Sequence, residues 1–370
     1  MNFSKLDAFM NDMPKRGYQG CELSVSKDGE IIYRKSVGYA DTQKTRPSSP
    51  DDIYWIFSAT KVITCIAAMK LVDTGVIALD DPVSKYIPEY ADIMVKTRDG
   101  KLHMAENVMT VEHLFTMTGG MDYSLCNAAI LPIISKGGST LEVVKAMAKN
   151  PLLFEPGTNY QYSLCHDVLA AVVEVASGMR FSEYLRKNFF EPLGVKDMGF
   201  FPNEEQKARF VSMYTHNAGV PEAVEVPLRN EFMLTENYES GGAGLFTTVD
   251  DYMKIITAVA CGEILSPKAL KMMGENRLTP QMLNDVCNNR KRLYGYGWGL
   301  CGRAHMDPVM SLSLSPVGEF GWDGAANAFA MIDATNRVAL YFGTQLRGGH
   351  YGYNVVHHVI KNLVYEGMEL

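Results

Sequence analysis

Residues 58–69 of the chain read Ser-Ala-Thr-Lys-Val-Ile-Thr-Cys-Ile-Ala-Ala-Met. The segment is apolar nearly all round, and Gly75 follows it as a helix stop. This pattern predicts a buried helix that begins at Ser58. Because side chains three residues apart share one face of a helix, the Lys61 amine can reach the Ser58 hydroxyl. The positive end of the helix also stabilises negative charge near that serine.

A Ser-x-x-Lys tetrapeptide alone is a weak signal, because Ser58 could equally be an ordinary helix cap. A second copy, Ser24 to Lys27, is present. It falls in a predicted strand, where residues three apart point to opposite faces. In the buried helix, desolvation disfavours the ammonium form of Lys61, so we expect its pKa to lie below the ordinary value.

A second candidate motif is Tyr160-Gln161-Tyr162-Ser163, between a turn at Pro156-Gly157 and a predicted helix. A tyrosine at this place lies on a loop at a helix start. A phenol beside a lysine ammonium can lose its proton more easily, and the phenolate can then accept the serine proton. The alternative is that both tyrosines are half-buried packing residues.

The third candidate is Phe320-Gly321-Trp322-Asp323-Gly324-Ala325-Ala326, ahead of a strand that we expect to start near Asn327. Small residues there allow a substrate to approach the backbone closely. An N–H group from this strand, together with that of Ser58, could form an oxyanion hole. The alternative is a glycine-rich turn around a buried tryptophan.

Strand patterns occur at both ends of the chain. Residues 22–33 alternate around Asp28-Gly29, which favours a tight hairpin. Two more strand-like runs, 326–333 and 337–344, come near the other end, and residues 353–365 follow with a helical period that should pack on the sheet. The two chain ends are therefore expected to build one antiparallel sheet.

The long middle of the chain has few strand signals. Its helical patterns fall at residues 111–117, 141–149, 164–176 and 182–190. We predict an α+β fold, an antiparallel β-sheet flanked by helices with a large, mainly helical insertion. The expected division is a discontinuous sheet domain, residues 1–81 and 237–370, and an insertion domain, residues 82–236. A cleft between them is a common place for a small-molecule site.

Composition excludes several classes of function. The 370 residues are 47% hydrophobic and 21% charged, which is typical of a globular protein with a sizeable core. A formal charge of −7 without a basic block gives no footprint for nucleic acid or an anionic membrane. The histidines show no metal-ligand spacing, so we expect neither a metal nor a cofactor.

The cysteines and the N-terminal segment indicate the compartment. No signal-peptide pattern occurs in residues 1–18, which read as a surface helix, and no apolar run reaches the length of about 18 residues that a membrane span needs. We expect a cytoplasmic protein, unless a leader has been removed. The seven cysteines are odd in number and scattered, and we expect reduced thiols at Cys21, Cys65, Cys126, Cys165, Cys261, Cys287 and Cys301.

Together and in this order, these motifs resemble the class C β-lactamase, penicillin-binding-protein and esterase superfamily of serine hydrolases. The similarity runs from about residue 15 to 350 and includes residues 54–58, 110–120, 191–194, 240–245 and 321–324. The resemblance implies that Ser58 is the nucleophile, with Lys61 and Tyr162 as its base. It also implies that Ser58 and Ala325 donate the oxyanion N–H groups. No G-x-S-x-G or H-E-x-x-H motif offers another hydrolase template.

Two departures from the family pattern concern the substrate. Leu164 occupies the position of the β-lactamase asparagine, and Trp322 that of the lysine or histidine of the third motif. Both changes remove polar groups that hold a β-lactam, while the nucleophile, base and oxyanion donors remain. The resemblance is therefore closest to the family VIII-type carboxylesterase branch. The alternatives are a β-lactamase, a D-alanyl carboxypeptidase or D-aminopeptidase, and a non-catalytic penicillin-binding-like sensor domain.

The expected partner is a small-molecule ester or amide. Arg347 and His350 could replace a carboxylate anchor, although solvated positions would suit them equally. Tyr123 and Tyr238 could instead belong to the core. The residues expected to contact substrate are Trp322, Gly324, Ala325, Met121, Tyr123, Leu164 and Tyr238.

Overall fold

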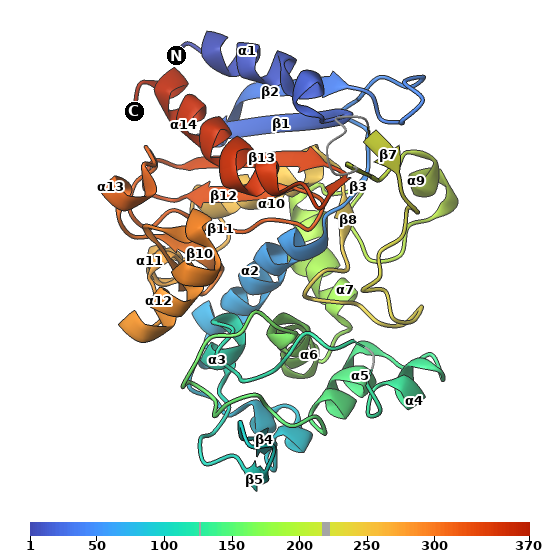
Figure 1. Ribbon diagram of the computed structural model, residues 1–370, viewed down its shortest axis with the longest axis vertical. Coiled ribbons are helices and arrows are strands. Elements are labelled where there is room, and N and C mark those ends of the chain that lie inside the picture. Colours follow the sequence, from blue (N-terminus) through green and yellow to red (C-terminus); the bar gives the residue numbers. More distant parts are fainter. Residues whose placement is uncertain (126, 217–222) are drawn as a thin grey trace.

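The computed structural model describes residues 1–125, 127–216 and 223–370. Its main sheet has seven strands in the order β2-β1-β13-β12-β11-β10-β9, each antiparallel to its neighbours. Strands from the two chain ends lie side by side, as predicted (Figure 1). The strands are β1 (Gly20–Lys27), β2 (Glu30–Gly38), β9 (Tyr296–Gly299), β10 (Gly302–His305), β11 (Phe320–Gly321), β12 (Phe329–Asp333) and β13 (Val338–Thr344).

The first hairpin turns at the residues that the sequence indicated. Asp28 and Gly29 have φ values of 51° and 91°, the left-handed conformation that a tight hairpin requires. The prediction for β12 was less accurate, because the strand begins at Phe329 and not near residue 326. Residues 324–328 instead form a turn, in which Gly324 N–H donates to Ala328 O and Asn327 N–H to Gly324 O.

Helices cover both faces of this sheet. Val338, Leu340 and Phe342 of β13 pack in one cluster with α1 and α14, whereas Ala339 and Tyr341 face α10 on the opposite side. The alternation follows from the two-residue period of a strand. The predicted C-terminal helix begins with a π-turn at Gly352–Val356. These helices are α1 (Ser4–Asn11), α10 (Val249–Ala260) and α14 (His357–Met368).

The middle of the chain is mainly helical and lies below the sheet in Figure 1. Helix α6 packs against α2, α3, α5 and α7. All four predicted helical stretches are present with shifted ends; the first stops at Phe115, and Met117 has a left-handed φ of 59°. The bounds are α2 (Thr60–Asp73), α3 (Val111–Phe115), α4 (Leu131–Ile134), α5 (Thr140–Met147), α6 (Cys165–Ser177), α7 (Phe181–Leu185), α8 (Glu191–Leu193) and α9 (Glu204–Ala208).

Short elements connect the helical part to the sheet part. Strand β6 pairs with β14, and β3 pairs with β8. The division of the chain at residues 81/82 and 236/237 stays a prediction. The remaining elements are β3 (Tyr54–Trp55), β4 (Met94–Lys96), β5 (Leu102–Met104), β6 (Tyr214–His216), β7 (Ala223–Glu225), β8 (Phe246–Thr247), β14 (Leu346–Arg347), α11 (Pro267–Gly274), α12 (Pro280–Asn289) and α13 (Pro308–Ser311).

Two expectations concern the chain as a whole. Within the described ranges, no helix combines the length and apolar character that crossing a bilayer needs. The six described cysteines are free thiols, and Cys126 lies outside the described residues.

Candidate active site

Ser58 lies where a short 3₁₀ turn, Phe57–Ala59, passes into α2. The residue before it, Phe57, has a φ of 46°, a conformation that a bulky residue adopts only when its surroundings impose it. A hydrogen bond from another helix stabilises the turn, because the Tyr252 hydroxyl of α10 donates to Ala59 O at 2.9 Å. Lys61 is 1% exposed, and its Nζ lies 3.2 Å from Ser58 Oγ. The spacing read from the sequence therefore brings the two groups together.

The Lys61 amine is surrounded by acceptors. It donates to Gly242 O at 2.7 Å and to Tyr123 Oη at 3.2 Å, in addition to Ser58. Beyond Gly242 lies the Asp167 carboxylate; a Cβ on Gly242 would come within 2.5 Å of Asp167 Oδ2 and 3.5 Å of Lys61 Nζ. Only a glycine at this position lets the carboxylate approach the amine so closely.

These neighbours decide the charge of Lys61. Burial alone lowers the pKa of the amine, but the oxygens of Tyr123, Tyr162 and Asp167 outweigh it and raise the pKa of Lys61 above its ordinary value. The expectation of a depressed pKa was wrong, because desolvation was considered there without the acceptors that surround the amine. Lys61 is an ammonium at neutral pH.

Two tyrosine rings stack beside this ammonium. Tyr123 and Tyr162 are parallel within 2°, with centroids 5.6 Å apart. Lys61 Nζ lies 4.7 Å from the centroid of Tyr162, and Trp322 Nε1 donates to Tyr162 Oη at 3.1 Å. Burial raises the pKa of Tyr123 to about 12, although Lys61 opposes the rise, so its phenol keeps its proton at neutral pH. The structure thus places Tyr162 beside Lys61, as expected, and adds Tyr123 as a direct hydrogen-bond partner of the amine.

The Gly324–Ala325 segment lies against the chain that leads into Ser58. A Cβ on Gly324 would come within 2.3 Å of Ile56 O, so the close approach requires glycine. The Ala325 amide donates to no backbone acceptor in the part of the chain that the structure describes. Ala325 lies in the turn before β12, which is an interior strand of the main sheet, and not in the strand itself.

A buried ionic network supports this turn. Asp323 pairs with Arg292, and with Arg303 at 3.2 Å. Desolvation alone would raise the pKa of Asp323, but Arg292, His357 and Arg303 hold it well below its ordinary range. The carboxylate therefore stays charged and fixes the turn against the end of the sheet.

Other predicted contact residues occupy different surroundings. The Tyr238 hydroxyl is buried and donates to Asp167 at 2.7 Å. Leu164 is buried at the start of α6 and lines a small cavity with Met121. Substrate contact by these three residues stays a prediction. Arg347 pairs with Glu231 at 2.6 Å, and His350 is exposed.

Sequence reasoning missed two residues beside Tyr162. The Trp298 ring lies 4.5 Å from Trp322 and 6.1 Å from Tyr162, centroid to centroid. The Arg290 guanidinium lies 4.9 Å from the Tyr162 centroid. No motif marks either residue, because both reach the site through folding of segments that carry no local signal.

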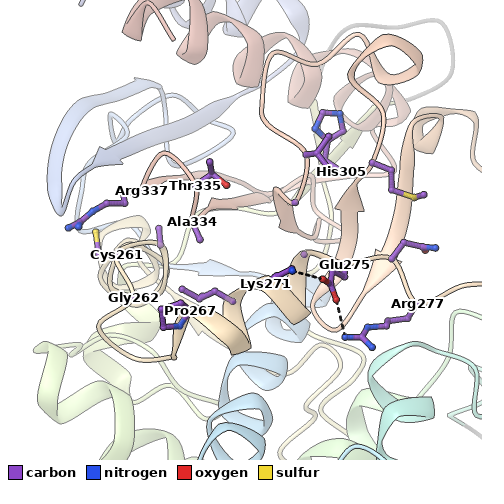
Figure 2. A pocket seen from close by; sticks show the side chains of 17 residues that line it. Cys261, Gly262, Pro267, Lys271, Glu275, Arg277, His305, Ala334, Thr335 and Arg337 are labelled. Carbon is purple, nitrogen blue, oxygen red and sulfur yellow. Dashed lines mark ion pairs between the residues drawn. The ribbon is translucent and has the colours of Figure 1, made fainter.

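A large cavity lies away from these residues. It has a volume of about 870 Å³ and is lined from α11, β10 and the β12–β13 connection, and no predicted site residue lines it. Figure 2 shows its charged rim, where Glu275 pairs with Lys271 and Arg277 at 3.9 and 3.5 Å. Its lining includes neither Ser58 nor Lys61 nor Tyr162, so chemistry and not volume identifies the candidate site.

Three features define the class of protein: the antiparallel sheet, the helical region, and the serine–lysine pair at the start of a buried helix. The protein has the β-lactamase fold and belongs to a family of serine hydrolases.

Comparison with known proteins gives the family. The model of the family described as Beta-lactamase matches residues 5–356, and the chain belongs to that family. It is 30% identical over 348 residues to Esterase EstB of Burkholderia gladioli, covering 87% of this chain and 84% of that protein. It is also 30% identical over 268 residues to Lovastatin esterase of Penicillium rubens, covering 68% and 67% of the two chains. A solved structure titled "EstCE1, a hydrolase with promiscuous acyltransferase activity" has a TM-score of 0.80 at 21% identity, covering 98% of each chain.

Proposed function

We propose that this protein is a carboxylesterase that forms an acyl-enzyme on Ser58, with Tyr162 as the general base and Lys61 as the cation that supports it. The observation that carries the proposal is the position of Lys61 Nζ, 3.2 Å from Ser58 Oγ and 4.7 Å from the Tyr162 centroid. The similarity to Esterase EstB supports ester hydrolysis over other reactions of the family.

The surroundings of Tyr162 suit the phenolate form that the proposed mechanism requires. An indole N–H from Trp322 donates to its oxygen, and Lys61 and Arg290 place cations over its ring. A serine hydroxyl is a weak nucleophile near neutral pH, so removal of its proton by such a base is required for fast acylation. Tyr123, whose phenol stays neutral, orients the Lys61 ammonium by hydrogen bonding.

The proposed acylation step follows from these contacts. The Ser58 proton moves to the phenolate of Tyr162 as the Oγ–carbonyl carbon bond forms, and the N–H groups of Ser58 and Ala325 stabilise the oxyanion. The bond to the alcohol oxygen then breaks, and Tyr162 returns the proton to the leaving alkoxide. Water, which gives a proton to the same base, attacks the acyl carbon; the bond to Ser58 Oγ breaks, Tyr162 returns the proton to Oγ, and the carboxylic acid is released.

The choice of esters over β-lactams rests on Trp322 and Leu164. Trp322 presents its indole N–H to Tyr162 where the β-lactamases carry a cationic or imidazole side chain, and Leu164 offers no side-chain amide. A β-lactam therefore loses polar contacts that an alkyl ester does not need. The alternative activity is that of a β-lactamase or a D-alanyl carboxypeptidase.

Labelling and relative rates test the proposal. A fluorophosphonate should label Ser58, located by peptide mass mapping, and should not label the Ser58→Ala variant. Short-chain p-nitrophenyl esters should have a much higher kcat/KM than a chromogenic cephalosporin. The reverse ranking would assign the site to β-lactam hydrolysis, and a folded protein that neither reacts with fluorophosphonate nor hydrolyses any of these substrates would be a non-catalytic domain.

A further inference from the structure

A cavity separate from the one in Figure 2 opens directly beside the proposed base. It has a volume of about 220 Å³, and its lining comes from two segments, the loop before α6 and the end of α12. Tyr162 is part of its wall, so the cavity adjoins the reacting groups. The lining residues are Tyr160, Gln161, Tyr162, Asp285, Val286 and Arg290.

The guanidinium of Arg290 is the cation of this cavity. It donates to the neutral Tyr160 hydroxyl at 3.3 Å and lies 4.9 and 6.0 Å from the ring centroids of Tyr162 and Trp322. No ion pair of Arg290 occurs within the described ranges. A guanidinium has five N–H donors, and one hydrogen bond leaves most of its donor capacity for a ligand.

The other arginines near the site differ from Arg290 in this respect. Arg292, two residues further on, pairs with Asp323, and Arg347, which the sequence suggested as a carboxylate anchor, pairs with Glu231. Their charges are balanced within the protein. Arg290, in contrast, has no ion pair among the described residues and faces a cavity beside the proposed base.

One acidic side chain shares the cavity. Asp285 lines it, and Gln281 Nε2 lies 3.3 and 3.5 Å from the two carboxylate oxygens. The Lys61 ammonium lies next to the Tyr162 ring that forms the wall. Arg290 and Asp285 are the charged side chains of the lining. Because the Lys61 ammonium already faces the Asp167 carboxylate, the attraction of an anionic ligand to this cavity rests on the open donors of Arg290.

The position of the cavity selects the part of the substrate that enters it. In the proposed mechanism Tyr162 returns the proton to the alkoxide, so the alcohol part of the ester must lie next to the Tyr162 hydroxyl. Lys61 Nζ lies 4.7 Å and Arg290 Cζ 4.9 Å from the centroid of the Tyr162 ring, so the two atoms are within about 10 Å of each other. A carboxylate a few bonds beyond the ester oxygen can reach the guanidinium across that distance.

Resting on the proposed esterase function, we propose that Arg290 binds a carboxylate on the alcohol part of the substrate, so that the preferred substrates are esters of hydroxy acids. A planar guanidinium can hold a carboxylate through two parallel N–H···O bonds, which Lys and neutral side chains cannot do. Arg290 thereby determines specificity, and Tyr160 orients its side chain.

Matched esters and variants test this assignment. The probes are 4-acetoxybenzoate and its neutral methyl ester, with each kcat/KM corrected for the rate of alkaline hydrolysis. The corrected ratio should favour the anion about 10-fold or more, since hydrogen bonds to charged groups are strong. In Arg290→Gln the ratio should fall towards one. In Lys291→Gln, which removes an equal charge from the neighbouring exposed side chain, it should stay at the wild-type value.

Two further measurements keep the assignment falsifiable if the variant does not fold. In the wild-type protein, raising the salt concentration should increase KM for 4-acetoxybenzoate more than for the methyl ester. The wild-type protein should show no preference for p-nitrophenyl hydrogen glutarate, which carries its carboxylate on the acyl side, over p-nitrophenyl pentanoate. A wild-type ratio near one, or a preference that survives Arg290→Gln, would overturn the assignment, as would an Arg290-dependent preference confined to the acyl side. If the wild-type protein had no esterase activity and were not labelled by the fluorophosphonate, this result would instead contradict the proposed function.

Discussion

Replacing one tyrosine at a time tests which phenol accepts the serine proton. Tyr162→Phe removes the oxygen that receives the Trp322 N–H and lies beside the Lys61 ammonium. General-base catalysis contributes about 10²- to 10⁴-fold, and we expect a loss of that size in kcat. Tyr160→Phe removes a hydroxyl bonded to Arg290 at 3.3 Å and should keep most activity on neutral esters.

Tyr123→Phe should behave differently from Tyr162→Phe. It removes one of three acceptors of the Lys61 amine, and Gly242 O and Ser58 Oγ remain. A hydrogen bond to a charged group contributes about 1.5–3 kcal/mol, which sets an upper limit of about 10- to 150-fold on the loss. Because burial raises the pKa of Tyr123 to about 12, its phenol is protonated in the assay range, and we do not expect it to be the base.

A double mutant separates a shared mechanism from two independent contributions. Lys61→Ala should also cost several orders of magnitude in kcat, and Lys61→Ala/Tyr162→Phe should be little worse than either single variant. The assay is p-nitrophenolate release from p-nitrophenyl butyrate from pH 6 to 9, with thermal unfolding as a control for folding. A greater loss in folded Tyr123→Phe than in Tyr162→Phe would assign the base to Tyr123. If all three tyrosine variants retained activity, the phenolate mechanism would have to be abandoned.

Three other predictions concern the proposed oxyanion turn and the half-buried carboxyl group of Glu174. Ala325→Pro removes the N–H donor and should lower kcat by about 10²-fold or more. Ala325→Gly keeps the donor and should not lower kcat. Activity retained in folded Ala325→Pro would contradict the role of Ala325 as an oxyanion donor. Gly324→Ala places a Cβ within 2.3 Å of Ile56 O. The turn should therefore move away from Ser58, and both Tm and kcat should fall. An unchanged Tm and kcat would show that the turn can shift without consequence. Burial raises the pKa of Glu174 to about 7, with a smaller contribution from Glu239. The unfolded chain therefore releases this proton at lower pH than the folded protein, and stability is lost as the pH rises from about 4.5 through 7. The fall in Tm between pH 5 and 8 should be smaller in Glu174→Gln than in the wild type, and an equal fall would show that another group titrates.

Local sequence patterns were sufficient for most elements of the fold. The Asp28-Gly29 turn was predictable because few residues adopt left-handed φ values easily. The helix after Ser58 was predictable from its uninterrupted apolar run, and the Ser58–Lys61 contact followed from helix geometry alone. These features depend on residues close together in the sequence.

The start of β12 could not be predicted in the same way. Residues 326–328 directly precede an apolar strand-like run, yet they form a turn because Gly324 packs against Ile56 O and hydrogen-bonds across to Ala328. That arrangement depends on a contact with a segment more than 250 residues away, which no local pattern records.

The charge of Lys61 was also decided by tertiary structure. The sequence indicated that Lys61 is buried, and burial alone predicts a lowered pKa for its amine. The folded chain adds the Tyr123 hydroxyl and the Asp167 carboxylate behind Gly242. Their combined field outweighs desolvation and raises the pKa of Lys61. Arg290 likewise reaches Tyr162 only because α12 packs beside the loop before α6. Residue spacing thus determined which groups could react, whereas the electrostatic balance around them was set by side chains that only folding brings within a few ångströms.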